Sequence, residues 1–318
     1  MTDLVLKNER LTITLSVADP GERDTLRFDT ACRVKEIILD GKYSFAVPEQ
    51  IRPKRITAGG FGLSAEFSVP EDLSTVKSGE TFTKPGVGIL TQLKDRAPYY
   101  IFGDYPVKPF KVLIDHGEDF VSFTELPETT DGTKSEYPLT ITKKLALKGN
   151  KICIETTVKN EGDKEVSINE YQHNFFSANK KPIGPDYKMI LPYAKDITGE
   201  EFIFDALDEN GVIVGKAESP ISWRGKEITW NKNTEGLAIF KELTRDKLID
   251  EGDSVPEYYY ELCDTKEGLY VREGGNFFPS KITVWGVEHV MCAENFIDIT
   301  LSSGESTNYA RVWEFGKR

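Results

Sequence analysis

Residues 139–158, LTITKKLALKGNKICIETTV, decide the fold class. Apolar and polar residues alternate along 139–147 and again along 152–158. A period of two is typical of strands that bury one face. Gly149 and Asn150, between the two runs, are residues that tight hairpin turns favour. The stretch therefore predicts two antiparallel strands joined by a short turn.

The same alternation extends over most of the chain. It appears in residues 11–17, and the turn dipeptides Asp40-Gly41 and Asn210-Gly211 follow further apolar runs. Strong helical periodicity, internal repeats and linker-like segments are missing from the sequence. Closely spaced strands with turns between them are typical of sandwiches and barrels. We therefore predict an all-β fold, a large β-sandwich that forms a single domain over residues 1–318.

The charge of the chain argues against two classes of partner. Its 318 residues include 52 acidic and 40 basic ones, which gives a formal net charge of -12. A surface of this sign repels the phosphates of nucleic acids and of anionic membranes. No apolar run approaches the length of a membrane span. We therefore expect neither nucleic acid nor membrane as a partner, and the sequence does not indicate an oligomeric state.

The cysteines and the first residues indicate the compartment. Cys32, Cys153, Cys263 and Cys292 lie far apart, without a C-x-x-C pair. This spacing favours buried free thiols over a disulfide framework or a zinc site. The opening MTDLVLKNERLTITL lacks the basic and apolar regions of a signal peptide. We therefore predict a cytoplasmic protein without a metal site.

Residues 168–176, INEYQHNFF, contain one of only three histidines. If a strand runs through His173, its even positions form a core-facing set that includes Ile168, while the odd positions include Tyr171 and Phe175. The odd face then combines aromatic planes with hydrogen-bonding groups, as a sugar-binding cleft requires. The alternative is a structural histidine with no functional role.

A second informative stretch, residues 282–301, contains Glu294 among apolar neighbours. Cys292, Ala293 and Phe296 flank it closely. A carboxylate in such company loses solvation, which favours proton transfer. The alternative is a strand-end glutamate that faces solvent. His289 lies an odd number of residues away, so on a straight strand it faces the opposite side and is not expected to be the partner of Glu294.

Both stretches carry a family resemblance. Asn169-x-x-x-His173-Asn174-Phe175-Phe176 is similar to an Asn-x-x-x-His-x-x-Phe motif of the galactose mutarotase-like (aldose 1-epimerase) superfamily. Residues 284–306, VWGVEHVMCAENFIDITLSSGES, resemble its closing pattern of a Trp-bearing strand, a Cys-x-Glu and a Ser-Gly-Glu turn. Residues 59–67, 84–90 and 183–193 resemble a bacterial branch of mutarotase-like proteins.

The resemblance implies a β-supersandwich and an acid–base pair. His173 corresponds to the catalytic acid of the family and Glu294 to its base. Anomer interconversion needs a base to take the proton of the C1 hydroxyl and an acid to protonate the ring oxygen. The implied ligand is a sugar or sugar derivative, and no metal or nucleotide cofactor is required.

The sequence also departs from the family pattern. Many mutarotases have a second histidine in a Gly-rich context, whereas the upstream His116 lies in LIDHGEDF. Arg52 and Arg55 have company similar to that of the sugar-binding arginine of the family, but their spacing differs and the role is not carried over. Asn295 follows Glu294, where the family commonly has proline.

The remaining candidates are substrate contacts. Tyr171 and Asn174 adjoin His173, Glu66 lies at a Gly-rich strand entry, and Lys84 could meet an anionic sugar. Trp285 and Phe277 are candidates for stacking platforms, although a core position is favoured for both.

Two alternatives to the epimerase remain open. A carbohydrate-binding protein without catalysis fits the same scaffold, as does another carbohydrate-active enzyme such as a glycoside hydrolase or lyase. The convergence of His173 and Glu294 on one cleft would favour the epimerase.

Overall fold

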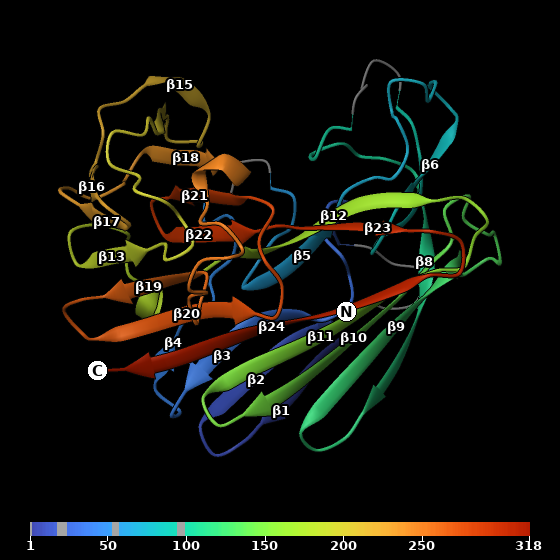
Figure 1. Cartoon of the computed structure of the whole chain (residues 1–318), viewed down its shortest axis with the longest axis horizontal. Coiled ribbons are helices and arrows are strands. Elements are labelled where there is room, and N and C mark those ends of the chain that lie inside the picture. The colour runs from blue at the N-terminus through green and yellow to red at the C-terminus, as the bar shows by residue number, and fades with distance from the viewer. Residues whose placement is uncertain (1, 18–23, 53–56, 94–98) are drawn as a thin grey trace.

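The computed structural model describes residues 2–17, 24–52, 57–93 and 99–318 of the chain. Within these residues the regular structure is almost all β (Figure 1), and the helical elements are the 3-10 turns η1 (Ala178–Lys180) and η2 (Arg245–Lys247). In this part of the chain no helix has the length and apolar character that a membrane span requires. The prediction of an all-β fold is confirmed.

The described strands form three antiparallel sheets. The seven-stranded sheet has the order β1 (Thr2–Lys7), β2 (Leu11–Val17), β3 (Arg33–Leu39), β5 (Leu63–Phe67), β12 (Val166–Asn174) and β23 (Ile297–Leu301), and β4 (Tyr43–Ser44) pairs with β3. The twelve-stranded sheet has the order β16 (Ile221–Arg224), β17 (Glu227–Trp230), β13 (Tyr187–Ile190), β19 (Tyr260–Asp264), β20 (Leu269–Gly275), β24 (Ser306–Lys317), β11 (Lys151–Asn160), β10 (Leu139–Lys148), β9 (Phe120–Thr129), β8 (Val107–His116), β7 (Gly88–Thr91) and β6 (Thr81–Lys84). The five-stranded sheet has the order β15 (Ile213–Lys216), β14 (Ile203–Leu207), β18 (Leu237–Leu243), β21 (Ile282–Val287) and β22 (Val290–Asn295).

The hairpin at residues 139–158 lies inside the twelve-stranded sheet. β10 pairs with β11 in an unbroken antiparallel register that reaches Lys148 opposite Lys151, so Gly149 and Asn150 form a two-residue turn. Gly149 has a φ of 58°, which a residue without a Cβ adopts at little cost. Most apolar side chains of β10 are buried, and its Thr side chains are half-buried on the opposite face. The predicted hairpin is confirmed.

The other predicted turns also form. Asp40 and Gly41, with φ of 53° and 66°, lie between β3 and β4. Gly211, with φ of 79°, lies between β14 and β15. Positive φ at such positions explains why Gly follows Asp or Asn in both turns.

The sheets form two layers. The twelve-stranded sheet is one layer, and the seven- and five-stranded sheets face it (Figure 1). The largest apolar core takes side chains from all three sheets, such as Ile13 of β2, Ile154 of β11 and Val284 of β21. This shared core is consistent with one domain, and the single-domain assignment stays a prediction.

One antiparallel partnership is interrupted. Glu170 of β12 lies opposite Ile297 of β23 in the ladder, and Phe176 lies opposite Met291 of β22 in an isolated bridge. Both pairs belong to one register, because five residues lie between 170 and 176 and five lie between 291 and 297. Between them, residues 171–175 and 292–296, all of which are described, form no ladder with each other. We call these two runs the open segment.

Candidate functional site

The two faces of β12 separate as the alternation predicted. Tyr171, His173 and Phe175 form one row, with ring centroids 6.1 Å apart for the first pair and 3.9 Å apart for the second. On the other face, Asn174 accepts a hydrogen bond from Nε1 of Trp313 in β24, 2.9 Å away. The Asn174 side therefore faces the twelve-stranded sheet. We call this side the inner face and the His173 side the outer face.

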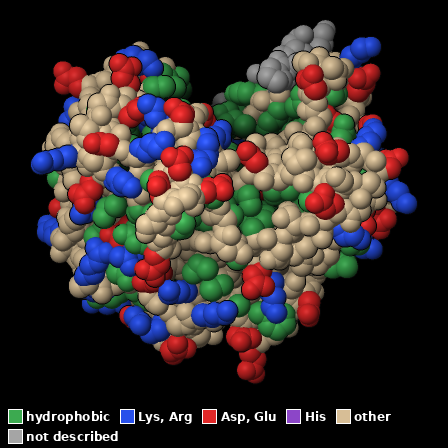
Figure 2. All heavy atoms as spheres, viewed as in Figure 1, with side chains coloured by type: hydrophobic (Ala, Val, Ile, Leu, Met, Phe, Trp, Pro, Cys, Tyr) green, Lys and Arg blue, Asp and Glu red, His purple; other side chains and the backbone are tan. Residues whose placement is uncertain are grey.

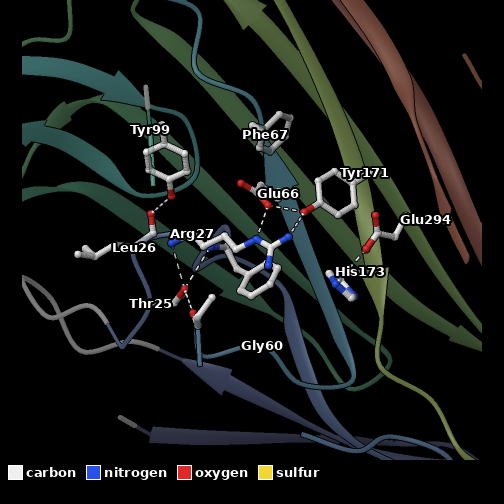
Figure 3. Close-up of polar contacts among 12 residues, drawn as sticks. Thr25, Leu26, Arg27, Gly60, Glu66, Phe67, Tyr99, Tyr171, His173 and Glu294 are labelled. Carbon is white, nitrogen blue, oxygen red and sulfur yellow. Dashed lines mark hydrogen bonds and ion pairs between the residues drawn. The ribbon is translucent and has the colours of Figure 1, made fainter. Parts of the chain in front are cut away.

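The open segment brings His173 and Glu294 together. Counting three residues back from Phe176 and three forward from Met291 reaches this pair, so the two lie opposite each other in the register. Nε2 of His173 lies 2.9 Å from Oε1 of Glu294, a distance at which a ring N–H donates to a carboxylate oxygen (Figure 3). The predicted convergence of the two side chains is therefore observed, while their catalytic roles stay predictions.

Aromatic rings enclose the imidazole. Phe175 stacks on His173 with an interplanar angle of 7°, while Phe28 and Trp285 approach edge-on with centroids 5.9 Å and 5.2 Å away. The side chains of His173 and Glu294 are only 4% and 8% exposed. We call these three rings the aromatic cage. The cage limits water at the pair, so an interaction between charges there is stronger than at the surface.

Cys292 lies at the other ring nitrogen. Its Sγ is 3.5 Å from Nδ1 of His173 and donates to the backbone oxygen of Trp285 at 3.3 Å. Burial raises the pKa of this thiol well above its ordinary value, so it remains protonated.

Cys292, His173 and Glu294 also form a donor set of a kind that binds zinc. Their donor atoms lie within 4.8 Å of one another. However, Nδ1 of His173 faces the sulfur while Nε2 faces the carboxylate, so neither nitrogen is directed at both other donors. Coordination of one ion by all three residues needs a single ring nitrogen beside both other donors, so this arrangement does not favour it.

A cluster of charged and phenolic groups lies next to the pair on the outer face (Figure 3). Glu66 of β5 accepts from Nε of Arg27 at 2.7 Å and from Nζ of Lys84 at 2.9 Å. The hydroxyl of Tyr171 donates to Glu66 and accepts from Nη2 of Arg27 at 2.7 Å. We call Arg27, Glu66, Lys84 and Tyr171 the outer cluster.

The outer cluster is electrostatically balanced around one carboxylate. Burial alone would raise the pKa of Glu66, but Lys84 and Arg27 lower it to about 2. Burial lowers the pKa of Lys84, and Glu66 opposes this effect. Burial also raises the pKa of Tyr171 well above its ordinary value. Glu66 is therefore ionised and Tyr171 neutral at physiological pH.

A second cluster lies beneath the site on the inner face. Arg311 of β24 bonds to Glu170 and, at 2.7 Å, to Oε1 of Glu273. Oε2 of Glu273 accepts from Asn174 at 2.8 Å and from Asn295 at 2.7 Å. Burial raises the pKa of Glu273 to about 7, although Arg311 opposes the shift. We call Glu170, Asn174, Glu273, Asn295 and Arg311 the inner cluster.

The predicted substrate contacts therefore separate into two groups. Tyr171 and Glu66 lie beside His173 and Glu294 on the outer face. Lys84 is 1% exposed and bonds to Glu66 and to the backbone oxygen of Phe67. It therefore holds Glu66 in place from the buried side. Asn174 is directed to the inner face. Direct sugar contact by any of these residues stays a prediction.

Sequence reasoning missed Arg27. It contacts both Glu66 and Tyr171, yet it lies in a stretch without strand alternation, so no periodic signal marked it. Arg52 instead pairs with Glu288, and Arg55 lies outside the described residues.

Two more of the residues singled out from the sequence lie apart from the pair. His116 ends β8 and is exposed. His289 has its Nε2 beside the backbone oxygen of Pro48 and, as expected, does not pair with Glu294. Trp285 belongs to the aromatic cage, whereas Phe277 packs against Tyr309 and Arg311 on the inner side.

Two hollows lie near the aromatic cage, and neither is lined by His173 or Glu294. Gly60, in the wall of the larger, packs against Phe28 and Phe175, and Thr25, in the wall of the other, accepts a hydrogen bond from the backbone N of Phe28. One has a volume of about 440 Å³ and includes Gln50, Arg52 and Phe61 in its wall. The other, of about 360 Å³, is lined in part by Thr25 and residues 101–105. Both volumes are within the range of small-ligand sites. Figure 2 shows the molecule hollowed at the top of the view, between the parts that carry β15 and β6, with hydrophobic side chains on the walls.

Comparisons with known proteins place the fold. No family model and no curated protein matches the sequence. A putative aldose 1-epimerase from Escherichia coli K12 is 11% identical, with a TM-score of 0.54 over 100% of this chain and 99% of that one. A galactose mutarotase-like protein from Lactobacillus casei is 13% identical, with a TM-score of 0.58 over 99% and 100%. A GalM/aldose epimerase homologue from C. elegans is 11% identical, with a TM-score of 0.52 over 99% of both. At these identities the likeness establishes the fold and not the activity.

Proposed function

We propose that this chain, which has the galactose mutarotase-like fold, is an aldose 1-epimerase-like enzyme that interconverts the anomers of a sugar or sugar derivative. The observation that carries the proposal is the contact of 2.9 Å between Nε2 of His173 and Oε1 of Glu294. An acid and a base, far apart along the chain, lie opposite each other and have few other polar partners. This is the minimum that anomer exchange requires.

In the proposed reaction the pair begins as imidazolium and carboxylate. The C1 end of the sugar enters between the two side chains and replaces their direct bond. Glu294 then takes the proton of the C1 hydroxyl while Nε2–H of His173 protonates the ring oxygen, and the bond between C1 and that oxygen breaks. Both residues are then neutral, and the sugar is an open-chain aldehyde. Rotation about the C1–C2 bond and the reverse transfers give the other anomer. Protons balance over the cycle, so the two residues require no external acid or base.

The surroundings support this use of the pair. The aromatic cage excludes water, which strengthens the charges that form during transfer. Nδ1 of His173 lies 3.5 Å from Sγ of Cys292, a weak hydrogen-bonding partner, so Nε2 is the ring nitrogen that faces Glu294 and that we assign to proton transfer. Arg27 and Glu66 keep 14% and 10% of their side chains exposed, and we assign them to sugar hydroxyls at the far edge of the ring.

We also propose that the ligand is a small carbohydrate and that the protein is cytoplasmic. A small carbohydrate fits the volume of the hollows near the cage. The four cysteines are free, as expected in a reducing cytoplasm.

The test is the rate of anomer equilibration over a panel of aldoses, followed by polarimetry or exchange NMR. We expect acceleration by the wild type and a loss of about 100-fold or more in H173A and E294Q, since each removes one proton-transfer group. H116A is the matched control, because His116 is exposed at the end of β8, and it should equal the wild type.

Sugar binding without acceleration would overturn the enzymatic proposal in favour of a carbohydrate-binding protein. Failure to bind or equilibrate any aldose would overturn both. Equal losses in H116A and H173A would show that the effect does not depend on the pair.

A further inference from the structure

The open segment is held together by side chains in place of a backbone ladder. Nδ2 of Asn174 donates to the backbone oxygen of Ala293 at 2.8 Å. Nη2 of Arg311 donates to the backbone oxygen of Asn295 at 2.9 Å. These two carbonyls belong to the residues immediately before and after Glu294. The backbone that carries Glu294 is therefore held on both sides from the inner face.

Both donors are themselves fixed in the inner cluster. Asn174 is fully buried and also bonds to Glu273 and Trp313. Arg311 is 2% exposed and bonds to the two carboxylates of Glu170 and Glu273. Buried groups with every partner in place have little freedom to move. The cluster can therefore hold the two carbonyls at a fixed distance from β12.

A continuous ladder would give a different site. Directly opposed residues of antiparallel strands have Cβ atoms about 4.5–5.5 Å apart. In the open segment no backbone ladder fixes the separation of the two runs, and an amide and a guanidinium group bridge them. The width of that separation sets how Glu294 approaches His173, and it decides whether the C1 end of a sugar can enter between them.

We propose that Asn174 and Arg311 are positioning residues that set the distance between His173 and Glu294 by taking the place of the missing backbone bonds. The proposal rests on the proposed function for its catalytic consequence. The geometric part, the placement of Glu294 beside His173, stands independently. Neither residue contacts the reacting atoms, so both act through the backbone of residues 293 and 295.

The experiment compares N174A with N160A. Asn160 is a matched control, because it is also fully buried and its Nδ2 donates to the backbone oxygens of Leu301 and Ser302, in each case at 3.1 Å. It lies at the far end of β11, away from the pair. Both variants lose buried amide bonds and should lose comparable stability, but only N174A loses a bond to the strand of Glu294.

We expect N174A to lower kcat by about 10- to 100-fold with KM within about twofold, since the groups remain but their distance changes. N160A should keep kcat within about twofold of the wild type. The conservative variant R311K keeps the charge toward the two carboxylates but loses the fork that reaches Asn295, and it should lower kcat in the same direction.

A second measurement does not depend on activity. The ring ¹⁵N and ¹H signals of His173 report its hydrogen bond to Glu294, and they should shift in N174A and R311K but not in N160A. If the wild type equilibrates no sugar, the proposed function fails, and these signals still decide the positioning role. Unchanged His173 signals in both N174A and R311K would overturn it, as would equal changes of kcat in N174A and N160A. If N174A does not fold, R311K alone decides by the same two readouts.

Discussion

The outer and inner clusters lie on opposite faces of β12, and they shift the pKa of a carboxylate in opposite directions. In the outer cluster, Glu66 has two cations, Arg27 and Lys84, and its pKa falls to about 2 against the burial that would raise it. In the inner cluster, Arg311 is shared between Glu170 and Glu273, and burial raises the pKa of Glu273 to about 7. Both carboxylates are largely removed from water, since the side chain of Glu66 is 10% exposed and that of Glu273 is 0% exposed.

The difference follows the number of cations bonded to each carboxylate. Glu66, bonded to Arg27 and Lys84, has its pKa lowered despite burial, whereas Glu273, which shares Arg311 with Glu170, has its pKa raised. The outer cluster therefore presents a fixed charge beside the site. The inner cluster contains a group that can gain or lose a proton near neutrality.

The largest effect is expected from E66Q, which leaves Arg27 and Lys84 buried without an anion. Breaking a buried pair in this way should lower the unfolding free energy by about 3–5 kcal/mol at neutral pH. Because the folded pKa of Glu66 is depressed from 4.5 to about 2, its stabilisation is present above pH 4.5 and is lost as the pH falls through about 2. Urea denaturation against pH measures both; a loss below about 1 kcal/mol would contradict the balance inferred here.

The next largest effect concerns Glu273, whose contribution to stability should depend on pH in the opposite direction to that of Glu66. The folded pKa of Glu273 is raised from 4.5 to about 7, so its contribution is present below pH 4.5 and is lost as the pH rises through about 7. A rise of this size corresponds to roughly 3 kcal/mol. E273Q removes this titration. Between pH 4.5 and about 7 the unfolding free energy of the wild type should therefore fall by about 3 kcal/mol more than that of E273Q. Parallel stability curves for the two proteins would contradict the prediction.

Y171F tests the phenolic bond of the outer cluster and should have a smaller effect. It removes a hydroxyl that bonds to Glu66 and Arg27, and hydrogen bonds to charged groups contribute about 1.5–3 kcal/mol. The control is Y270F, whose hydroxyl donates to Glu314 at 2.7 Å where solvent reaches the pair, so its loss should be smaller. Chemical denaturation compares the two, and equal losses would show that burial adds nothing to the bond.

The smallest effect is expected from D40N. Arg10 and Asp40 form a bonded pair with side chains 44% and 40% exposed. A surface pair of this kind contributes little to stability, and less at high salt, because water and ions screen its charges. Denaturation of D40N and E66Q therefore compares an exposed carboxylate that pairs with one cation with a buried one that pairs with two. A D40N loss as large as that of E66Q would remove the distinction.

Local patterns in the sequence predicted the features that depend on a single strand or turn. The alternation of residues 166–176 placed Tyr171 and His173 on one face and Asn174 on the other, because side-chain direction in a strand depends only on position. The hairpin at Gly149 was predicted for the same reason, since turn chemistry is local.

Long-range pairing was not visible in the same way. Glu294 was singled out by its apolar neighbours, its role as a base came from the resemblance to a family motif, and no periodicity places it opposite His173. Arg27 was missed because its position depends on β5 and β12 approaching a segment without regular structure. The role of Arg311 depends on the packing of one layer against the other, which no short motif contains.

The number of residues in each strand of the open segment is itself constrained. It is bounded by paired residues at both ends, and each strand contributes five residues to it. One inserted or deleted residue between 170 and 173 would turn every later side chain to the other face, so that the imidazole would meet the inner cluster instead of Glu294. Surface loops of this protein can change length at small cost. In the open segment, by contrast, the number of residues must be kept even where their types are changed.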